Sequence, residues 1–382
     1  MEKAVSGVFA ELVAQLHSGR RLTFEHLKEF LDDPQAVIPR QNGEFEILLA
    51  LLKPNEEVME FGLEDDRQAL VIKRDKEYFA VLDGVEHGPY AEIKSFLHDD
   101  THFCFAAKRG ENWFVVRDGG EFGPYDHIND LKYSNDHVFF EISTVINGEK
   151  TAVAVLDGKV LGSTGGRSHV GLVDGHHFFV HPRDDGECYV SLDDQKFGPF
   201  APVSGLGYAE GHFFFIEGNR IHLDRETIDV DGTPHLVGYA EGHLFYILER
   251  TCNQKSECYA VLDGKEFGPY EFCARPNLGY SEGHFYFLIV ADRTYGEVIG
   301  VMVDGKQIAR VGNAYDLQYS NGHSLFHMWN SETRIVRVIM DGRLGDTNMD
   351  YDTIYLTQAK DNRLFIYGRR GRRIYKTVIP LK

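Results

Sequence analysis

Apolar and polar positions along this chain alternate in short runs. One run, from His284 to Val290 (HFYFLIV), is followed by a charged loop and then by a second run, from Glu297 to Gly305 (EVIGVMVDG). Both are rich in aromatic and β-branched residues and are bounded by Gly, Asp or Asn, which is typical of a β-hairpin. Because they lack the three- and four-residue spacing of an amphipathic helix, we expect mostly β-sheet.

The hairpins recur along the chain. A short strand precedes each one, as in LGYSEG (278–283), and another follows, as in DGKEFGPYEF (263–272). The aspartates that end the second hairpin strand recur about every 37 residues, close to the period of a propeller blade. Each unit is thus four antiparallel strands, A to D, and radial stacking of such sheets covers their faces. These aspartates are Asp83, Asp118, Asp157, Asp193, Asp224, Asp263, Asp304 and Asp341.

The pattern predicts an all-β fold, a β-propeller of eight to nine four-stranded blades, with nine favoured by the hairpin count. The ninth hairpin (NRLFIYGRRGRRIYKTVIPLK) reaches the end of the sequence within strand C. Its blade therefore needs a fourth strand, and we expect a strand within residues 36–52 to supply it. Nine blades exceed the usual four to eight, so an eight-bladed ring with one displaced hairpin remains open.

The segment ahead of the repeats has a different pattern. Its apolar residues fall at helical spacing in two stretches, separated by SGRR. Thr23 is a suitable N-cap for the second stretch, and Pro34 follows its end. We therefore expect a helical segment at 1–35, as a clasp packed on the propeller, a cover for the channel mouth or a docking element, and a propeller over 36–382. The apolar residues are Val5, Val8, Phe9, Leu12, Val13, Leu16, Phe24, Leu27, Phe30 and Leu31.

Composition and charge narrow the choice of partners. The 59 acidic residues outnumber the 40 basic ones, for a net charge of -19. This charge disfavours nucleic acid and favours a partner with basic patches. No apolar run is long enough to cross a bilayer, and no secretory signal is visible, so we expect no membrane association and a cytoplasmic location.

The five cysteines are odd in number and form no zinc-type CxxC pair, which fits free thiols in a reducing compartment. A disulfide between Cys252 and Cys258 across a hairpin loop is a less favoured alternative. We expect no cofactor. The sequence does not indicate an oligomeric state.

The motifs SEGHFYF and AVLDGKEFGPYE resemble the TolB-like and WD-like bacterial propeller repeats, and the resemblance covers roughly residues 57–380. In such repeats an SPDG-type turn joins strands A and B, and a DGK turn joins strands C and D. The resemblance implies the fold only. TolB-like proteins are typically exported and contact envelope partners, and those properties do not carry over to a chain without a visible signal sequence.

A histidine begins strand B in seven of the units. A set of imidazoles invites a metal hypothesis. However, the A-B and C-D turns emerge at the same end of an up-and-down sheet, so each histidine can lie near the aspartate of its own or a neighbouring blade. We therefore expect a structural tie between turns, worth about 1 kcal/mol if neutral, and no metal. The histidines are His102, His137, His176, His212, His243, His284 and His323, and their aspartates are Asp118, Asp157, Asp193, Asp224, Asp263, Asp304 and Asp341.

The repeated phrase typified by DGKEFGPY (263–270) can be interpreted in structural terms. Its opening Asp-Gly is a preferred pair for a two-residue hairpin turn. The proline that follows cannot donate to a sheet ladder, so it belongs on an edge strand and guards that edge against pairing with other chains. The aromatic residues after it, Tyr90, Tyr125, Phe200 and Tyr270, are expected to pack between blades.

Few motifs point to chemistry. The cluster GRRGRR supplies a candidate anion site at Arg369, Arg370, Arg372 and Arg373, unless it simply lies in solvent. DVDG (229–232) lacks the trailing glutamate of a calcium loop. The sequence lacks GxSxG, HExxH and Walker signatures. The leading hypothesis is a non-enzymatic scaffold that binds a protein or peptide through its variable B-C and D-A loops. The alternative is a hydrolase or lyase with a site at the central channel, near His169, His235 and Asp350.

Overall fold

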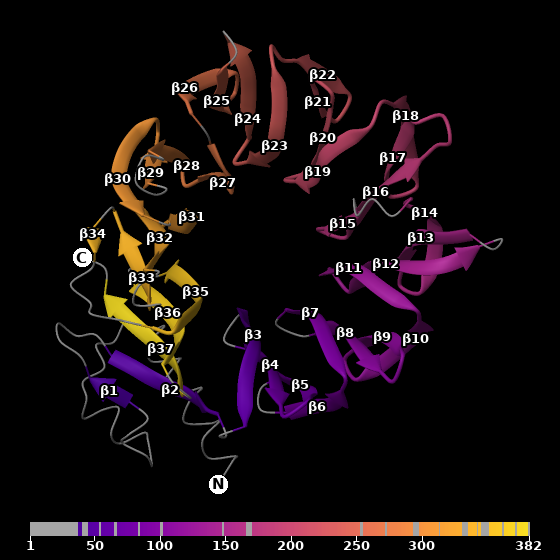
Figure 1. The fold of residues 1–382 in the computed structure, drawn as a ribbon, viewed down its shortest axis with the longest axis vertical. Coiled ribbons are helices and arrows are strands. Elements are labelled where there is room, and N and C mark those ends of the chain that lie inside the picture. The colour runs from indigo at the N-terminus through magenta and orange to yellow at the C-terminus, as the bar shows by residue number, and fades with distance from the viewer. Residues whose placement is uncertain are drawn as a thin grey trace. The chain divides into compact units, whose positions relative to one another are not determined.

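A computed structural model shows the fold (Figure 1). It describes residues 37–39, 45–52, 55–64, 67–82, 85–99, 102–146, 149–165, 170–252, 255–271, 273–292, 298–312, 314–330, 335–341, 343–344, 351–360, 363–370 and 373–380. Within these ranges all regular structure is β-strand, arranged in nine antiparallel sheets. The helical segment expected at 1–35 lies outside the described residues, so this prediction and the domain boundary stay predictions.

The chain divides into two compact units. The first comprises Met1–Pro54, Ser331–Arg337 and Thr347–Lys382, and the second comprises Asn55–Asn330 and Val338–Asp346. The sheets of the second unit follow the chain in order, one sheet to each repeat, and we number them as blades 1 to 8. The sheet of the first unit is blade 9. The chain is thus a nine-bladed β-propeller in fold class, which resolves the open choice between eight and nine.

Blades 1 to 4 have the strand order expected for the repeat. Blade 1 is β3 (Glu56–Glu64), β4 (Arg67–Arg74), β5 (Glu77–Leu82) and β6 (Val85–Tyr90). Blade 2 is β7 (Glu92–His98), β8 (Phe103–Arg109), β9 (Asn112–Arg117) and β10 (Gly120–Tyr125). Blade 3 is β11 (His127–Ser134), β12 (His137–Ile146), β13 (Glu149–Leu156) and β14 (Lys159–Ser163). Blade 4 is β15 (Val170–Val173), β16 (His176–Pro182), β17 (Cys188–Leu192) and β18 (Gln195–Phe200).

Blades 5 to 8 repeat the same A-B-C-D order. Blade 5 is β19 (Val203–Ala209), β20 (His212–Glu217), β21 (Arg220–Leu223) and β22 (Glu226–Asp229). Blade 6 is β23 (Thr233–Ala240), β24 (His243–Cys252), β25 (Lys255–Leu262) and β26 (Lys265–Tyr270). Blade 7 is β27 (Cys273–Ser281), β28 (His284–Asp292), β29 (Val298–Val303) and β30 (Lys306–Gly312). Blade 8 is β31 (Ala314–Ser320), β32 (His323–Asn330), β33 (Ile335–Met340) and β34 (Arg343–Leu344).

Blade 9 combines strands from both ends of the sequence. Its order is β1 (Val37–Pro39), β2 (Phe45–Leu51), β37 (Arg373–Pro380), β36 (Arg363–Arg370) and β35 (Thr353–Lys360). Strand β2 pairs antiparallel with β37, for example Phe45 with Val378. It therefore takes the D position of this sheet, and β1 adds a fifth strand beyond it.

Apolar side chains between successive sheets form the core of the second unit. Strand B supplies much of it, because both of its faces are covered and its residues are almost all buried. Phe105 lies between blades 1 and 2, Phe140 between blades 2 and 3, and Phe287 between blades 6 and 7, each at most 1% exposed. Burial of this apolar area drives the sheets to pack face to face.

A Gly-Pro-aromatic sequence, GPY or GPF, ends strand D in four blades, and its aromatic residue packs on the next sheet, as expected. Tyr90 lies edge-on to Phe105, with ring centroids 5.7 Å apart, and Tyr270 lies 5.8 Å from Phe287. The proline sits where the pairing of strand D with strand C is interrupted, so its missing N–H costs no ladder hydrogen bond. The Gly-Pro bonds at Pro89, Pro124, Pro199 and Pro269 are all cis.

Candidate functional site

The seven predicted histidines each lie beside an aspartate of their own blade. In every pair the histidine Nδ1 is 2.6–2.8 Å from Oδ2 of the aspartate. The other carboxylate oxygen, Oδ1, accepts the backbone N–H of the residue after the histidine at 2.9–3.1 Å. One carboxylate thus links the C-D turn to the start of strand B. The stabilising role of these pairs stays a prediction.

The aspartates also shape the turn itself. Asp263 has a φ of 48°, in the left-handed region that Asp and Asn tolerate better than most residues, and Gly264 follows at 79°. Positive φ at both positions matches the twist of a tight hairpin. The same side chain therefore suits the backbone of the turn and anchors the next strand.

The histidine rings also contact the following blade. His243 packs on Tyr280 and His284 on Tyr319, with ring centroids 4.4 Å apart in both cases. His176 with Tyr208 and His212 with Tyr239 repeat the contact at 4.5 Å. A polar contact within one blade is therefore coupled to a packing contact between two.

A ladder of glutamates connects the A-B turns of blades 5 to 8. Glu210 accepts the backbone N–H groups of Glu241 and Gly242 at 2.7 and 3.1 Å. Glu241 binds the next turn in the same way, and Glu282 accepts from Asn321 and Gly322 at 2.7 and 2.9 Å. These bonds lower the pKa of Glu210 and Glu282 below its usual value, with the Glu241 amide the main cause for Glu210 and the Gly322 amide for Glu282.

At the A-B and C-D turn end of these sheets, the aspartate, histidine and glutamate side chains therefore make contacts within the protein itself. Within the described ranges no group of three or more His, Cys, Asp or Glu side chains is placed to hold a metal ion. The described residues contain no helix that is long and apolar enough to cross a membrane.

The opposite end of the sheets, where D-A and B-C segments lie, has a different geometry. Among the described strands, the pairing of strand A with strand B shifts register in eight blades. In five of these blades a residue at the shift has a left-handed backbone. The φ values are 53° at Ser95, 46° at Asp130, 61° at Gly205, 22° at Leu236 and 52° at Asp316. Bulges re-aim side chains and are common near functional sites, and their non-glycine residues store local strain.

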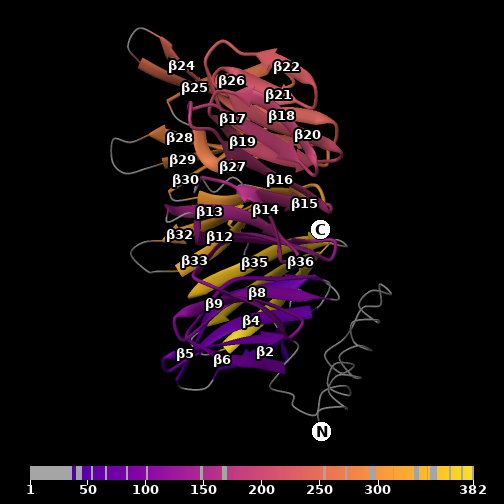
Figure 2. The same ribbon diagram turned by 90° about the vertical axis from the view of Figure 1, so that its right-hand side faces the viewer.

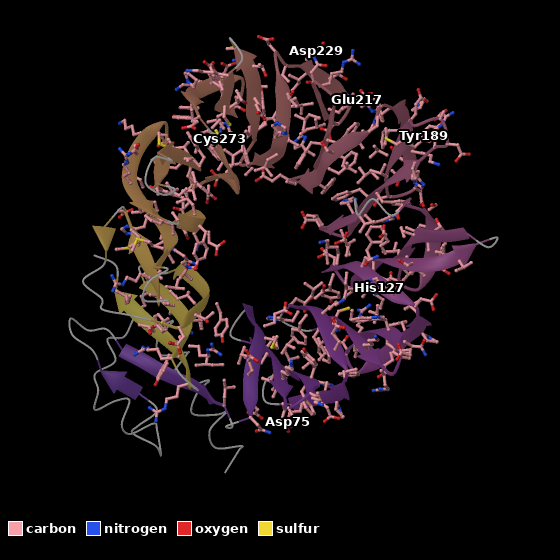
Figure 3. All side chains as sticks on the ribbon, viewed as in Figure 1. Asp75, His127, Tyr189, Glu217, Asp229 and Cys273 are labelled. Carbon is pink, nitrogen blue, oxygen red and sulfur yellow. The ribbon has the colours of Figure 1, made fainter. Side chains whose placement is uncertain are left out.

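Two neighbouring bulges border a polar notch between blades 2 and 3. Its volume is about 240 Å³, and β7 and β11 supply most of its lining. Ala106, Ile128 and Leu131 are buried and form its apolar part. The polar lining consists of Lys94, Ser95, His127, Asn129 and Asp130. Figure 3 labels His127 on β11, at the D-A end of blade 3.

Some of the polar groups in the notch already have partners. The Lys94 ammonium lies 3.2 Å from Glu92 and 4.5 Å from the centroid of the Trp113 ring. The Asn129 amide donates to Glu141 at 3.3 Å, and Glu141, 1% exposed, also accepts from the Thr164 hydroxyl. The charge of Lys94 is therefore compensated locally, whereas the buried carboxylate of Glu141 is hydrogen-bonded by neutral donors.

Other groups in the notch are not engaged in this way. Within the described part of the chain, the Asp130 carboxylate and the Ser95 hydroxyl make no hydrogen bond or ion pair, and His127 contacts only the edge of the Trp113 ring, at 5.8 Å. No described hydrogen bond joins Ser95, His127 and Asp130 to one another. The notch thus offers polar groups to a ligand without an assembled nucleophile and base.

The B-C hairpins differ in length from blade to blade at this same end. Strands β24 and β25 pair as far as Cys252 with Lys255, whereas β20 and β21 turn already after Glu217 with Arg220. In Figure 2 the β24–β25 and β28–β29 hairpins extend to the same side. The alternative of a Cys252–Cys258 disulfide is wrong, because none of the five cysteines forms a disulfide, and Cys258 lies opposite Glu249 in the sheet.

The remaining candidates lie apart from the notch. His235, at the D-A end of blade 6, bonds Glu249 through Nε2 at 2.9 Å, whereas His169 and Asp350 lie outside the described residues. Arg370 stacks between Tyr351 and Tyr375, at 4.8 and 4.6 Å from their centroids. Arg369 precedes it in β36, which ends at Arg370. Arg373 begins β37 and is exposed, and Arg372 lies outside the described ranges. Anion binding by this cluster stays a prediction.

Sequence reasoning missed the notch and the glutamate ladder. The ladder had a signal, since the A-B turns of blades 5 to 7 all read xEGH. The notch had a weaker one. Asp130 and Asp316 suit a left-handed bulge, but Ser95 and Leu236 are residue types from which such a bulge would not be predicted.

No protein-family model and no curated protein matches this sequence. A solved structure described as a eukaryotic initiation factor is similar over 82% of this chain and 92% of its own, with 11% identity and a TM-score of 0.53. BamB from Moraxella catarrhalis covers 87% of this chain and 98% of its own, with 11% identity and a TM-score of 0.45. An acylaminoacyl peptidase from Pyrococcus horikoshii covers 74% of this chain and 57% of its own, with 9% identity and a TM-score of 0.39.

At such identities the likeness concerns the fold alone. The likeness to the initiation factor, together with the nine antiparallel sheets, confirms the fold-level resemblance to propeller repeat proteins that the sequence predicted. The described part of the chain is an all-β propeller.

Proposed function

We propose that the protein is a non-enzymatic scaffold that binds a protein or peptide partner at the D-A and B-C end of its blades. A difference between the two ends of the same sheets carries the proposal. At the A-B and C-D end, seven blades repeat one set of contacts, with the histidine to aspartate distance constant within 0.2 Å. At the other end, bulge residues and hairpin lengths vary, as expected where a ligand sets the sequence.

The charge of the chain supports a partner with basic patches. A net charge of -19 would speed the approach of a basic surface and disfavour acidic competitors. A cytoplasmic location and the absence of nucleic acid among its ligands belong to this proposal.

Affinity purification from cells of the natural source tests the scaffold function. In one variant, residues 251–256 are replaced by Asn-Gly, so that a two-residue turn directly follows the pair Arg250–Glu257. The control is Lys306→Gln at the C-D turn of blade 7, where the side chain is exposed. We expect a stoichiometric partner with the wild type and the control, and its loss or weakening with the shortened hairpin. Recovery of no partner, or equal recovery with all three proteins, would contradict the proposal.

The alternative is a hydrolase or lyase. One observation favours it, namely that a hydroxyl, an imidazole and a carboxylate line a single notch. Hydrolysis of chromogenic esters and amides by the wild type, abolished by Ser95→Ala, would establish this alternative. Activity that survives the substitution would not come from the notch.

A further inference from the structure

The notch between blades 2 and 3 contains a carboxylate without a partner beside an apolar surface. Asp130 is held at a φ of 46° on the bulge of β11, and it makes no hydrogen bond or ion pair within the described ranges. Ala106, Ile128 and Leu131 supply buried apolar surface next to it. This combination suits a side chain with an apolar stem and a cationic head.

The positive charge in the notch does not oppose such a ligand. Lys94 is paired with Glu92 and stacked on Trp113, so its charge is already compensated. Glu141 adds a buried carboxylate behind Asn129. The four ionisable groups Lys94, Glu92, Asp130 and Glu141 therefore leave an excess of negative charge around the notch when the carboxyls are ionised.

The size of the notch limits the ligand to a single side chain. Its volume of about 240 Å³ is larger than the roughly 150 Å³ of an engineered cavity that binds benzene, but smaller than typical pockets for drug-sized ligands. Beyond Asp130, the Ser95 hydroxyl, the His127 ring and the Asn129 side chain can offer acceptor atoms to N–H donors. A guanidinium or ammonium has several such donors.

We propose that this notch binds the side chain of an arginine or lysine from the basic partner. The inference rests on the proposed scaffold function and adds the chemistry that the partner must present. Asp130 is the recognition residue in this assignment, and the bulge of β11 fixes its position.

Fluorine NMR of protein labelled with 5-fluorotryptophan tests the assignment. The chain has two tryptophans, of which Trp113 contacts Lys94 and His127 at the notch, whereas Trp329 belongs to β32 and serves as the internal reference. The probe is N-acetyl-argininamide, which has a single positive charge. We expect a saturable shift of the Trp113 signal and no shift with the neutral citrulline analogue.

Two substitutions that each remove one negative charge locate the group that binds the probe. Asp130→Asn removes the carboxylate and keeps a residue that tolerates the left-handed backbone, whereas Asp126→Asn removes a neighbouring exposed carboxylate outside the notch. We expect Asp130→Asn to weaken binding at least about fivefold and Asp126→Asn by less than about twofold. Asp130→Gly, which also suits the backbone, should reproduce the loss if the first variant folds poorly.

Equal binding by Asp130→Asn and the wild type would overturn the assignment, as would a saturable shift with N-acetyl-glutamate amide instead of the arginine probe. Absence of any saturable shift would overturn it too. If the partner is still captured through the β24–β25 hairpin in that case, only this inference fails and the scaffold function stands.

Discussion

The two ends of each blade differ in how their polar groups are used. At the A-B and C-D end, the Asp263 carboxylate binds His243 and the Leu244 N–H, and Glu241 and Glu282 bind neighbouring turns. At the D-A and B-C end, Asp130 has no described partner, and the hairpins differ in length. The comparison teaches that the repeated sequence motifs contain polar groups whose hydrogen bonds are made within the fold. Polar groups that are open to a ligand lie where the sequence differs from blade to blade.

The largest expected effect is on the free energy of unfolding of Asp263→Ala. The variant loses two hydrogen bonds and forces alanine into a backbone with a φ of 48°, which together should cost about 3 kcal/mol. The control at the other end is Asp229→Ala, which removes an exposed contact to Arg220 and should cost less than about 0.5 kcal/mol. Urea unfolding monitored by circular dichroism measures both. Equal costs would erase the distinction between the two ends.

A smaller effect is expected for the double variant His243→Ala and His284→Ala. Each imidazole is bonded to one aspartate and packed on one tyrosine of the next blade, so the pair should cost about 2 kcal/mol and lower the melting temperature. His235→Ala is the matched control, because that histidine also bonds a carboxylate but lies at the D-A end. Unchanged stability of the double variant, with loss of a bound ligand, would show that these histidines bind a ligand and do not stabilise the turns.

The lowered pKa of His181, at the B-C end of blade 4, should make the free energy of unfolding depend on pH. Burial, and then the charge of Lys196, lower its pKa from an ordinary 6.5 to about 4. The unfolded chain therefore takes up a proton that the folded chain refuses, so stability should fall as the pH drops from about 6.5 to 4. Partial exposure reduces the effect to about 1–2 kcal/mol.

His181→Gln should remove this pH dependence while leaving the stability at pH 7.5 nearly unchanged. Thermal melts at pH 7.5 and pH 4.5 give the measurement. If wild type and variant lose the same stability on acidification, the acid sensitivity belongs to other groups.

The smallest effect is expected for Glu282→Gln in the ladder. Hydrogen bonds from Gly322 and Asn321 lower the pKa of Glu282, so its contribution is present above about 4.5 and is lost as the pH falls below that value. The difference in melting temperature between wild type and variant should therefore be small at pH 7 and vanish near pH 3. Glu226→Gln, at an exposed site of β22, should show no such difference at either pH. A larger gap at low pH than at neutral pH would reverse the assigned sign.

Much of the fold could be predicted from the sequence because each blade repeats the same local requirements. Asp-Gly sets a turn, His and Asp bring two turns together, and alternating apolar runs set the strands. The pairing of Tyr280 with His243 was not predictable in this way, since it depends on how one sheet faces the next.

The candidate site was less predictable for a physical reason. A bulge arises where the strand pairing shifts, and side chains as different as Ser95, Asp130 and Leu236 occupy it, so no residue type marks it. The notch further requires two bulges on adjacent blades, which local sequence does not encode. The variable loops pointed to the end of the sheets at which the notch lies, but not to Asp130.

The closure of each histidine and aspartate pair within a single sheet has an evolutionary consequence. Since His284 and Asp304 are encoded within 21 consecutive residues, a gene duplication that copies one blade copies the complete pair with it. The ladder glutamates behave differently, because each one needs an amide from the following copy. The gain or loss of a whole blade would therefore leave the histidine–aspartate bonds of the remaining blades intact, but it would change which backbone amides the ladder glutamates meet.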